Sequence, residues 1–146
     1  MLISWNWLNR YIDLDGLDPQ EVGESFTLKV AELDDVYPIG QGLEGVRTAR
    51  VTKVAPHLDA KKLSIVEIDD GEDTHTLICG APNVRNAVGN VVAWVQPGTH
   101  LPSGMQIEVA EIRGIVSHGM LASEEELGLS DENEGIWVLP EATPIG

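Results

Sequence analysis

The feature that most constrains the fold is a series of short, β-prone runs that begins at Val46 and is interrupted by glycine and proline. Residues 46–55 mix β-branched and charged side chains, which is typical of a long, partly exposed strand. Asp70-Gly71 lies between two such runs and is a hairpin signal. Strands are predicted at residues 46–55, 63–69, 74–79, 91–95 and 107–112, with a last one at 136–139. Five or so short strands with Gly/Pro turns predict a small Greek-key β-barrel.

The residues before Val46 follow a different pattern, which predicts two short helices within residues 1–28. Ser4 can cap a first helix whose apolar face runs through Trp5, Leu8 and Ile12. The run Asp18-Pro19-Gln20-Glu21 is typical of a helix start, with an N-cap acceptor and a proline at the first helical position. Three glycines and a proline within residues 38–45 predict a linker, and we place a domain boundary there.

Composition narrows the class of protein. A length of 146 residues suits one domain, or one domain plus a fragment of another, and a 42% hydrophobic content allows a modest core. Cys79 is the single cysteine, so neither an internal disulfide nor a cysteine-based zinc site is expected. The first residues lack a basic leader, and no stretch approaches the roughly 18 consecutive apolar residues of a membrane span. These features predict a soluble, cytoplasmic protein.

The charge is unevenly distributed along the chain. Nine lysines and arginines against 24 aspartates and glutamates give a net charge of -15. Seven of the nine cations fall within residues 45–121, where they meet eight acidic residues. Residues 122–146 hold seven acidic residues and no cation. The middle of the chain is therefore the segment with the best chance of contacting phosphates.

Two segments between predicted strands, residues 77–85 and 114–123, are rich in glycine, proline, asparagine and serine. Neither segment has the pattern of a catalytic motif. Small polar breaks of this kind are where a β-barrel presents backbone groups and side chains to a ligand. A five-stranded barrel with a polar face is a candidate OB-fold, and OB-folds bind oligonucleotides.

Residues 56–63, which read Pro-His-Leu-Asp-Ala-Lys-Lys-Leu, resemble the His-Pro-Asn-Ala-Asp-Lys-Leu signature of the tRNA-binding OB module. His57, Ala60, Lys62 and Leu63 match this signature. Leu58, Asp59 and Lys61 depart from it, which leaves the contacts of this loop open.

Two further runs resemble the β chain of bacterial phenylalanyl-tRNA synthetases in particular. They are Cys-Gly-Ala-Pro-Asn-Val-Arg at residues 79–85 and Ser-Glu-Glu-Glu-Leu-Gly-Leu at residues 123–129. The opening Ile-Ser-Trp-Asn-Trp-Leu at residues 3–8, followed by Tyr11, resembles the first helix of that chain. Four motifs in the right order are far more specific than one.

The resemblance implies a fold that is mainly β with short helices: a five-stranded OB barrel preceded by a small partial α/β segment. Residues 1–39 would be the N-terminal part of a small α/β domain, and residues 40–146 the tRNA-binding OB domain. The chain would then be a fragment of a longer β chain, with no cofactor of its own. Its implied partners are tRNA, the synthetase α subunit and the remaining β-chain domains. ATP and magnesium would be needed by the parent ligase, whose aminoacylation is carried mainly by the α subunit.

Five residues in these motifs, or in and next to the segment 114–123, are candidates for RNA binding. Lys62, Arg85 and Arg113 are candidates for phosphate contacts, and Asn83 and Ser117 for hydrogen bonds to a sugar or a base edge. The alternative for the three cations is an ordinary solvated surface position. The alternative for Asn83 is a turn residue that bonds to its own backbone, which is the more common role.

The other chemistry-bearing residues favour structural roles. Trp94 lies within an apolar run and is expected to pack inward, Met120 and Leu121 are expected in the core, and Cys79 is expected to be buried. The four histidines have no spacing that suggests a metal site. The carboxylates of residues 124–126 suit the first turn of a short helix.

Two functional hypotheses follow. The first is a non-catalytic tRNA-binding module that adds backbone contacts to a tRNA held elsewhere. The second is a structural or protein-interaction module that packs against other synthetase domains or subunits with little RNA contact, which the acidic ends favour. An independent enzyme is not indicated, because no nucleophile or acid/base constellation is visible.

Overall fold

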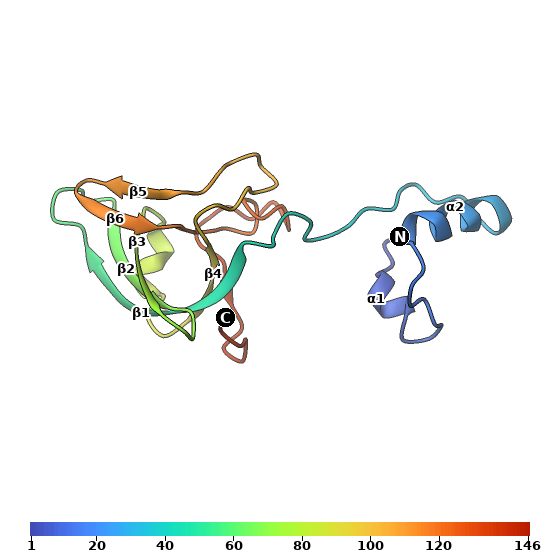
Figure 1. The fold of residues 1–146 in the computed structure, drawn as a ribbon, viewed down its shortest axis with the longest axis horizontal. Helices are drawn as coiled ribbons and strands as arrows, with labels where there is room; N and C mark the ends of the chain where they lie inside the picture. Colours follow the sequence, from blue (N-terminus) through green and yellow to red (C-terminus); the bar gives the residue numbers. More distant parts are fainter. The chain divides into compact units, whose positions relative to one another are not determined.

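The computed structural model describes all residues from Met1 to Gly146 and divides them into two compact units, Met1–Pro38 and Ile39–Gly146. The first unit contains two helices, and the second is built from strands (Figure 1). Neither helix combines the length and the apolar character that crossing a membrane requires.

The helices of the first unit begin where the sequence predicts. Helix α1, Trp5–Leu8, is capped by Ser4, whose Oγ accepts from the Trp7 amide at 3.3 Å. It is shorter than the apolar pattern predicts and ends before Ile12, since Asn9 Oδ1 accepts from the Leu14 amide at 2.7 Å and turns the chain.

Helix α2, Pro19–Lys29, is capped by Asp18, whose carboxylate accepts from the amides of Gln20 and Glu21. Gly23 on this helix packs against Val36, and a Cβ there would lie 2.6 Å from a Val36 methyl. Proline at the first helical turn and a carboxylate at the N-cap are the features that start helices in general.

The second unit is organised around an antiparallel sheet in the order β3-β2-β1-β4-β7, with β8 also paired to β4. Its strands are β1 (Val46–Pro56), β2 (Ser64–Asp69), β3 (Thr74–Cys79), β4 (Val91–Val95), β7 (Met120–Leu121) and β8 (Val138–Leu139). A separate hairpin joins β5 (Val109–Ile112) and β6 (Ile115–His118), and η1 (Pro82–Asn86) is a 3₁₀ helix.

Strand β1 makes the sheet curl. Its first half pairs with β4, from Val46 opposite Val95, and its second half pairs with β2, ending with Pro56 opposite Ser64. The register shifts between Val51 and Lys53, where Thr52 is the extra residue of a bulge. A bulge bends its strand and increases the local twist, so one strand serves both halves of the barrel.

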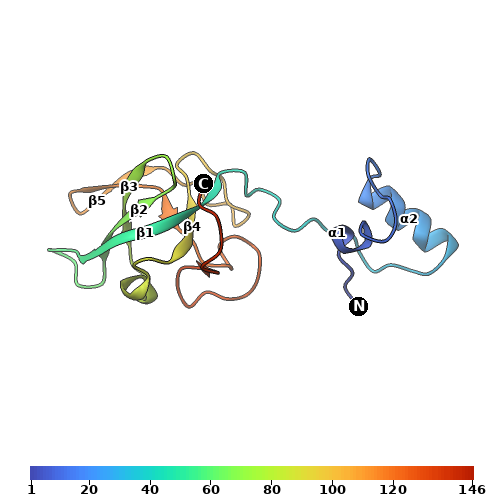
Figure 2. The same cartoon turned by 90° about the horizontal axis from the view of Figure 1, so that it is seen from below.

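The β5–β6 hairpin, a separate two-stranded sheet, flanks the curled sheet and lies next to β3 (Figures 1 and 2). The Ile78 amide on β3 donates to Ser117 Oγ on β6 at 3.0 Å. The C-terminal residues lie along β1, where the Gly146 amide donates to the Thr48 carbonyl at 2.9 Å. The result is a mainly β, OB-like half-barrel, as the sequence predicts.

The core has two parts that meet at β4, every residue of which is buried. Val92 and Trp94 face one cluster, together with Val51, Val66 and Leu77. Ala93 and Val95 face a second cluster, which also contains buried Leu101, Ile107, Ala122 and Leu127. Strand β4 is covered on both faces, which explains its unbroken apolar sequence. The predicted burial of Trp94, Leu121 and Cys79 is confirmed.

Several local predictions were wrong. Residues 114–123 form strands β6 and β7, although the sequence predicted a break. The strand predicted at 107–112 begins at Val109, and the last strand is only Val138–Leu139. Residues 124–128 form turns where a short helix was expected, and they are capped by Ser123, whose Oγ accepts from the Glu126 amide while its own amide donates to the Glu126 carboxylate.

Candidate nucleic-acid interface

The structure brings Lys62 and Arg85 into neighbouring segments. Lys62 lies in the loop between β1 and β2, and Arg85 lies in η1. Arg85 Nη2 donates to the Lys61 carbonyl oxygen at 3.0 Å, which joins the two segments directly. Lys61, Lys62 and Arg85 are all exposed, so three cations gather at one place on an otherwise acidic chain.

The β1–β2 loop, residues 57–63, is held by a short network of hydrogen bonds. The His57 amide donates to the Leu63 carbonyl at 3.0 Å, and the Leu63 amide donates to the Ala60 carbonyl at 2.9 Å. The Asp59 amide donates to His57 Nδ1 at 3.1 Å. Asp59 therefore supports the loop through its backbone, so its departure from the family signature does not break the loop.

Arg113 occupies the turn between β5 and β6. Its φ is 52° and that of Gly114 is 82°, so two consecutive residues have positive φ, as in a type I′ hairpin turn. The Arg113 side chain is exposed. In both views the β5–β6 turn and the β1–β2 loop lie at the left-hand end of the barrel (Figures 1 and 2).

Asn83 and Ser117 make internal hydrogen bonds in this structure. Asn83 Oδ1 accepts from the Ile136 amide at 3.0 Å, and its Nδ2 donates to the Ile136 carbonyl at 2.8 Å. Ser117 is 2% exposed, and its Oγ donates to the Gly119 carbonyl while accepting from Ile78. Each of these side chains joins segments that are distant in sequence. Their polar atoms are therefore already hydrogen-bonded within the protein, whereas the side chains of the three cations are exposed.

Three other cations lie on strand β1, apart from Lys61, Lys62 and Arg85. Lys53 pairs with Glu67 at 2.8 Å, and Arg50 donates to the Gly89 carbonyl at 2.8 Å. Arg47 is exposed near the start of β1. Sequence reasoning missed Lys61 as a candidate because it departs from the signature, although the Lys61-Lys62 pair was itself a signal.

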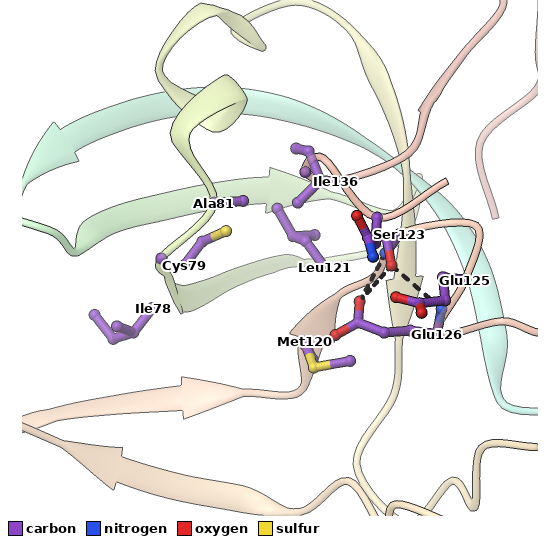
Figure 3. Close-up of a pocket in the computed structure, with 12 residues that line it drawn as sticks. Ile78, Cys79, Ala81, Met120, Leu121, Ser123, Glu125, Glu126 and Ile136 are labelled. Atoms are coloured by element: carbon purple, nitrogen blue, oxygen red, sulfur yellow. Dashed lines mark hydrogen bonds between the residues drawn. The ribbon is translucent and has the colours of Figure 1, made fainter. Parts of the chain in front are cut away.

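A cavity of about 320 Å³ opens elsewhere, between β3, β7 and residues 123–136 (Figure 3). Apolar Ile78, Met120 and Leu121 line it together with the carboxylates of Glu125 and Glu126. Burial raises the pKa of the Cys79 thiol, which also lines the cavity, against the opposing effect of a hydrogen bond with the Ala81 backbone, and the Glu126 carboxylate raises it further. The carboxylates make this cavity unsuited to a phosphate, and the raised pKa makes Cys79 a poor nucleophile.

Comparison with known proteins points to one family. Residues 46–146 match the family model described as "Putative tRNA binding domain". The whole chain is 42% identical to the phenylalanine–tRNA ligase beta subunit of Desulfotalea psychrophila over 146 residues, which is 18% of that protein. It is 40% identical to the corresponding subunit of Geobacter metallireducens, again over 146 residues and 18% of its length. The chain thus spans less than a fifth of these curated relatives.

A solved structure supports the fold. The crystal structure of a MetRS related protein from Pyrococcus horikoshii superposes with a TM-score of 0.54 at 18% sequence identity. The match covers 77% of this chain and 95% of the other. By its barrel, its motifs and this family match, the chain belongs to the tRNA-binding domain family, in a form that resembles phenylalanine–tRNA ligase beta subunits along its whole length.

Proposed function

We propose that this chain is a non-catalytic tRNA-binding module of a phenylalanine–tRNA ligase beta subunit. It adds auxiliary contacts to the RNA backbone while the rest of the enzyme holds and aminoacylates the tRNA. The observation that carries this proposal is the cluster of exposed Lys61, Lys62 and Arg85 at the joined β1–β2 loop and η1. Exposed cations on adjacent segments bind phosphates without reading base sequence.

We assign the phosphate contacts to Lys62, Arg85 and Arg113, with Lys61 as a fourth cation. Asn83 and Ser117 remain proposed contacts of lower rank, because binding RNA would compete with the internal hydrogen bonds of both side chains. The protein-interaction alternative is not favoured for the barrel, because the family match falls on that unit.

The wider setting is also a proposal. The module would act in the cytoplasm beside the ligase α subunit and the remaining β-subunit domains, in an enzyme that uses ATP and magnesium. We propose that residues 1–39 are the N-terminal part of a small α/β domain and that residues 40–146 form the tRNA-binding domain. The exposed apolar side chains of the first unit support the idea that other parts of the enzyme pack against it.

A salt titration of tRNA-Phe binding tests the proposal. The wild-type chain is compared with the triple variant Lys62→Ala/Arg85→Ala/Arg113→Ala. The slope of log K against log salt is negative, and each lost phosphate contact should reduce its magnitude by about 0.7–0.9. The affinity of the variant at low salt should also be lower than that of the wild type.

Arg47→Ala is the matched control, because it removes one cation from the far end of β1, up to roughly 30 Å along the strand. This variant should bind like the wild type. Absence of wild-type binding at low salt, or an equal loss in Arg47→Ala, would contradict the proposed interface.

A further inference from the structure

The β1–β2 loop contains a buried polar atom that has no partner. His57 is 5% exposed, and its Nε2 makes no hydrogen bond within the protein. Buried polar atoms are nearly always hydrogen-bonded in folded proteins, so an exception needs an explanation. His57 is also one of the residues that match the family signature, and the cation cluster does not account for it.

The other ring nitrogen determines what kind of partner is missing. His57 Nδ1 accepts a hydrogen bond from the Asp59 amide at 3.1 Å, so Nδ1 carries a lone pair. In the neutral ring the proton then resides on Nε2, which is a donor. The loop therefore holds an unused N–H group that requires an acceptor.

The surroundings of the loop favour an anionic acceptor. Lys61 and Lys62 follow His57 within five residues, and Arg85 is bonded to the Lys61 carbonyl at 3.0 Å. Asp59 is the one carboxylate of this loop, so its exposed side chains together with Arg85 carry a net positive charge. A phosphate oxygen of an RNA backbone meets this requirement.

The loop must move for such a contact to form, because Nε2 is shielded in the unbound chain. Leu58, at the start of segment 58–62, is 94% exposed, so no packing of its side chain opposes a shift of this segment. The bond between Arg85 and Lys61 links the cations to this segment. A phosphate that draws Arg85 away from the Lys61 carbonyl removes one of the bonds that hold the loop closed.

We propose that His57 Nε2–H donates a hydrogen bond to an RNA backbone phosphate at the β1–β2 loop, after the segment 58–62 shifts to admit it. This proposal rests on the proposed tRNA-binding function and adds a neutral contact to the cations. A neutral donor releases no counterion, so its loss lowers affinity and leaves the salt slope unchanged. This property distinguishes His57 from Lys62 and Arg85.

The test uses two substitutions, each of which replaces only one of the two ring nitrogens by an amide atom at a similar position. His57→Asn retains an acceptor at the position of Nδ1 and removes the Nε2 donor, whereas His57→Gln retains a donor near Nε2 and loses the acceptor. Urea unfolding and tRNA-Phe affinity across a salt series are measured for both variants and the wild type. His100→Asn, at an exposed histidine of another loop, is the matched control.

We expect His57→Asn to unfold like the wild type and to bind tRNA-Phe about tenfold or more weakly with an unchanged salt slope. His57→Gln is expected to be less stable but to bind more tightly than His57→Asn. Wild-type affinity in His57→Asn, or equal losses in both variants in step with their stability, would overturn the role of His57. Absence of binding by the wild type itself would instead refute the proposed function.

Discussion

The two compact units use their apolar residues in opposite ways. In the first unit Leu14 is the only buried apolar side chain, while Trp7, Tyr11, Phe26 and Leu28 are among those exposed. In the second unit apolar side chains from β1 to β4 and from residues 101–136 form two continuous clusters. The helices of the first unit are capped and the strands of the second unit are paired, yet only the second unit has a core. Well-formed local structure therefore does not by itself produce a core.

Replacing one tryptophan in each unit tests this contrast most strongly. Trp94→Ala is expected to destabilise the barrel by about 3–5 kcal/mol, because Trp94 is 2% exposed and its indole donates to the His118 carbonyl at 2.9 Å. Trp7→Ala, at a residue that is 50% exposed, should change stability by about 0.5 kcal/mol or less. Urea unfolding followed by circular dichroism measures both, and similar losses would refute the contrast.

Replacing glycines of the barrel by alanine tests how closely its backbone segments are packed. A Cβ at Gly119 would lie 2.2 Å from the Val95 carbonyl oxygen, and the φ of this residue is +91°. Gly119→Ala should therefore cost about 3 kcal/mol or more from strain and overlap together. Gly89 has a φ of +88° with nothing within 4 Å of its Cβ position. Gly89→Ala should show the strain alone, so the difference between their unfolding midpoints reports the crowding.

The hydrogen bonds of Asn83 provide a third comparison, between a structural and an RNA-binding role. Asn83→Ala removes both bonds to the Ile136 backbone and should cost about 1–3 kcal/mol. Asn86→Ala, at an exposed residue of the same 3₁₀ helix, should have little effect. Stability and tRNA-Phe affinity are measured together. Lost affinity with unchanged stability would assign Asn83 to RNA.

Acid should weaken the barrel through Asp70 in the β2–β3 turn. The backbone N–H of Asp73 lowers the pKa of this carboxyl against the opposing effect of burial, and the Glu72 amide and His75 lower it further. A lowered pKa stabilises the fold above the unfolded value of about 3.9, and this contribution is lost as pH falls through the folded pKa. Asp70→Asn should flatten the decline in urea midpoint between pH 5 and pH 2, and an equally steep decline would contradict this assignment.

Removal of the first unit should have the smallest effect. A chain of residues 39–146 retains both core clusters and should unfold within about 0.5 kcal/mol of the whole chain, since the deleted residues contribute to neither cluster. The peptide of residues 1–38 is expected to show little helix by circular dichroism, because short helices without packing are marginal in water. A cooperative transition in this peptide would contradict the view that the unit lacks a core.

Features that depend on residues close by in the sequence could be predicted from the sequence alone. The caps at Ser4 and Asp18, the strand starts at Val46, Thr74 and Val91, and the inward position of Trp94 all follow from local patterns. The concentration of cations in the middle of the chain was equally visible. These features are set by hydrophobic period, capping chemistry and turn residues, which act within a few positions.

The tertiary structure decided what depends on distant partners. The β5–β6 hairpin docks on β3 through the bond between Ser117 and Ile78, which are 39 positions apart, and Asn83 bonds to Ile136, which lies 53 positions further along the chain. Arg85 reaches the Lys61 carbonyl across 24 residues, and the burial of the unpaired Nε2 of His57 is apparent only in the folded chain. A hydrogen bond between remote segments leaves no periodic trace in the sequence, because its geometry exists only after the chain has folded.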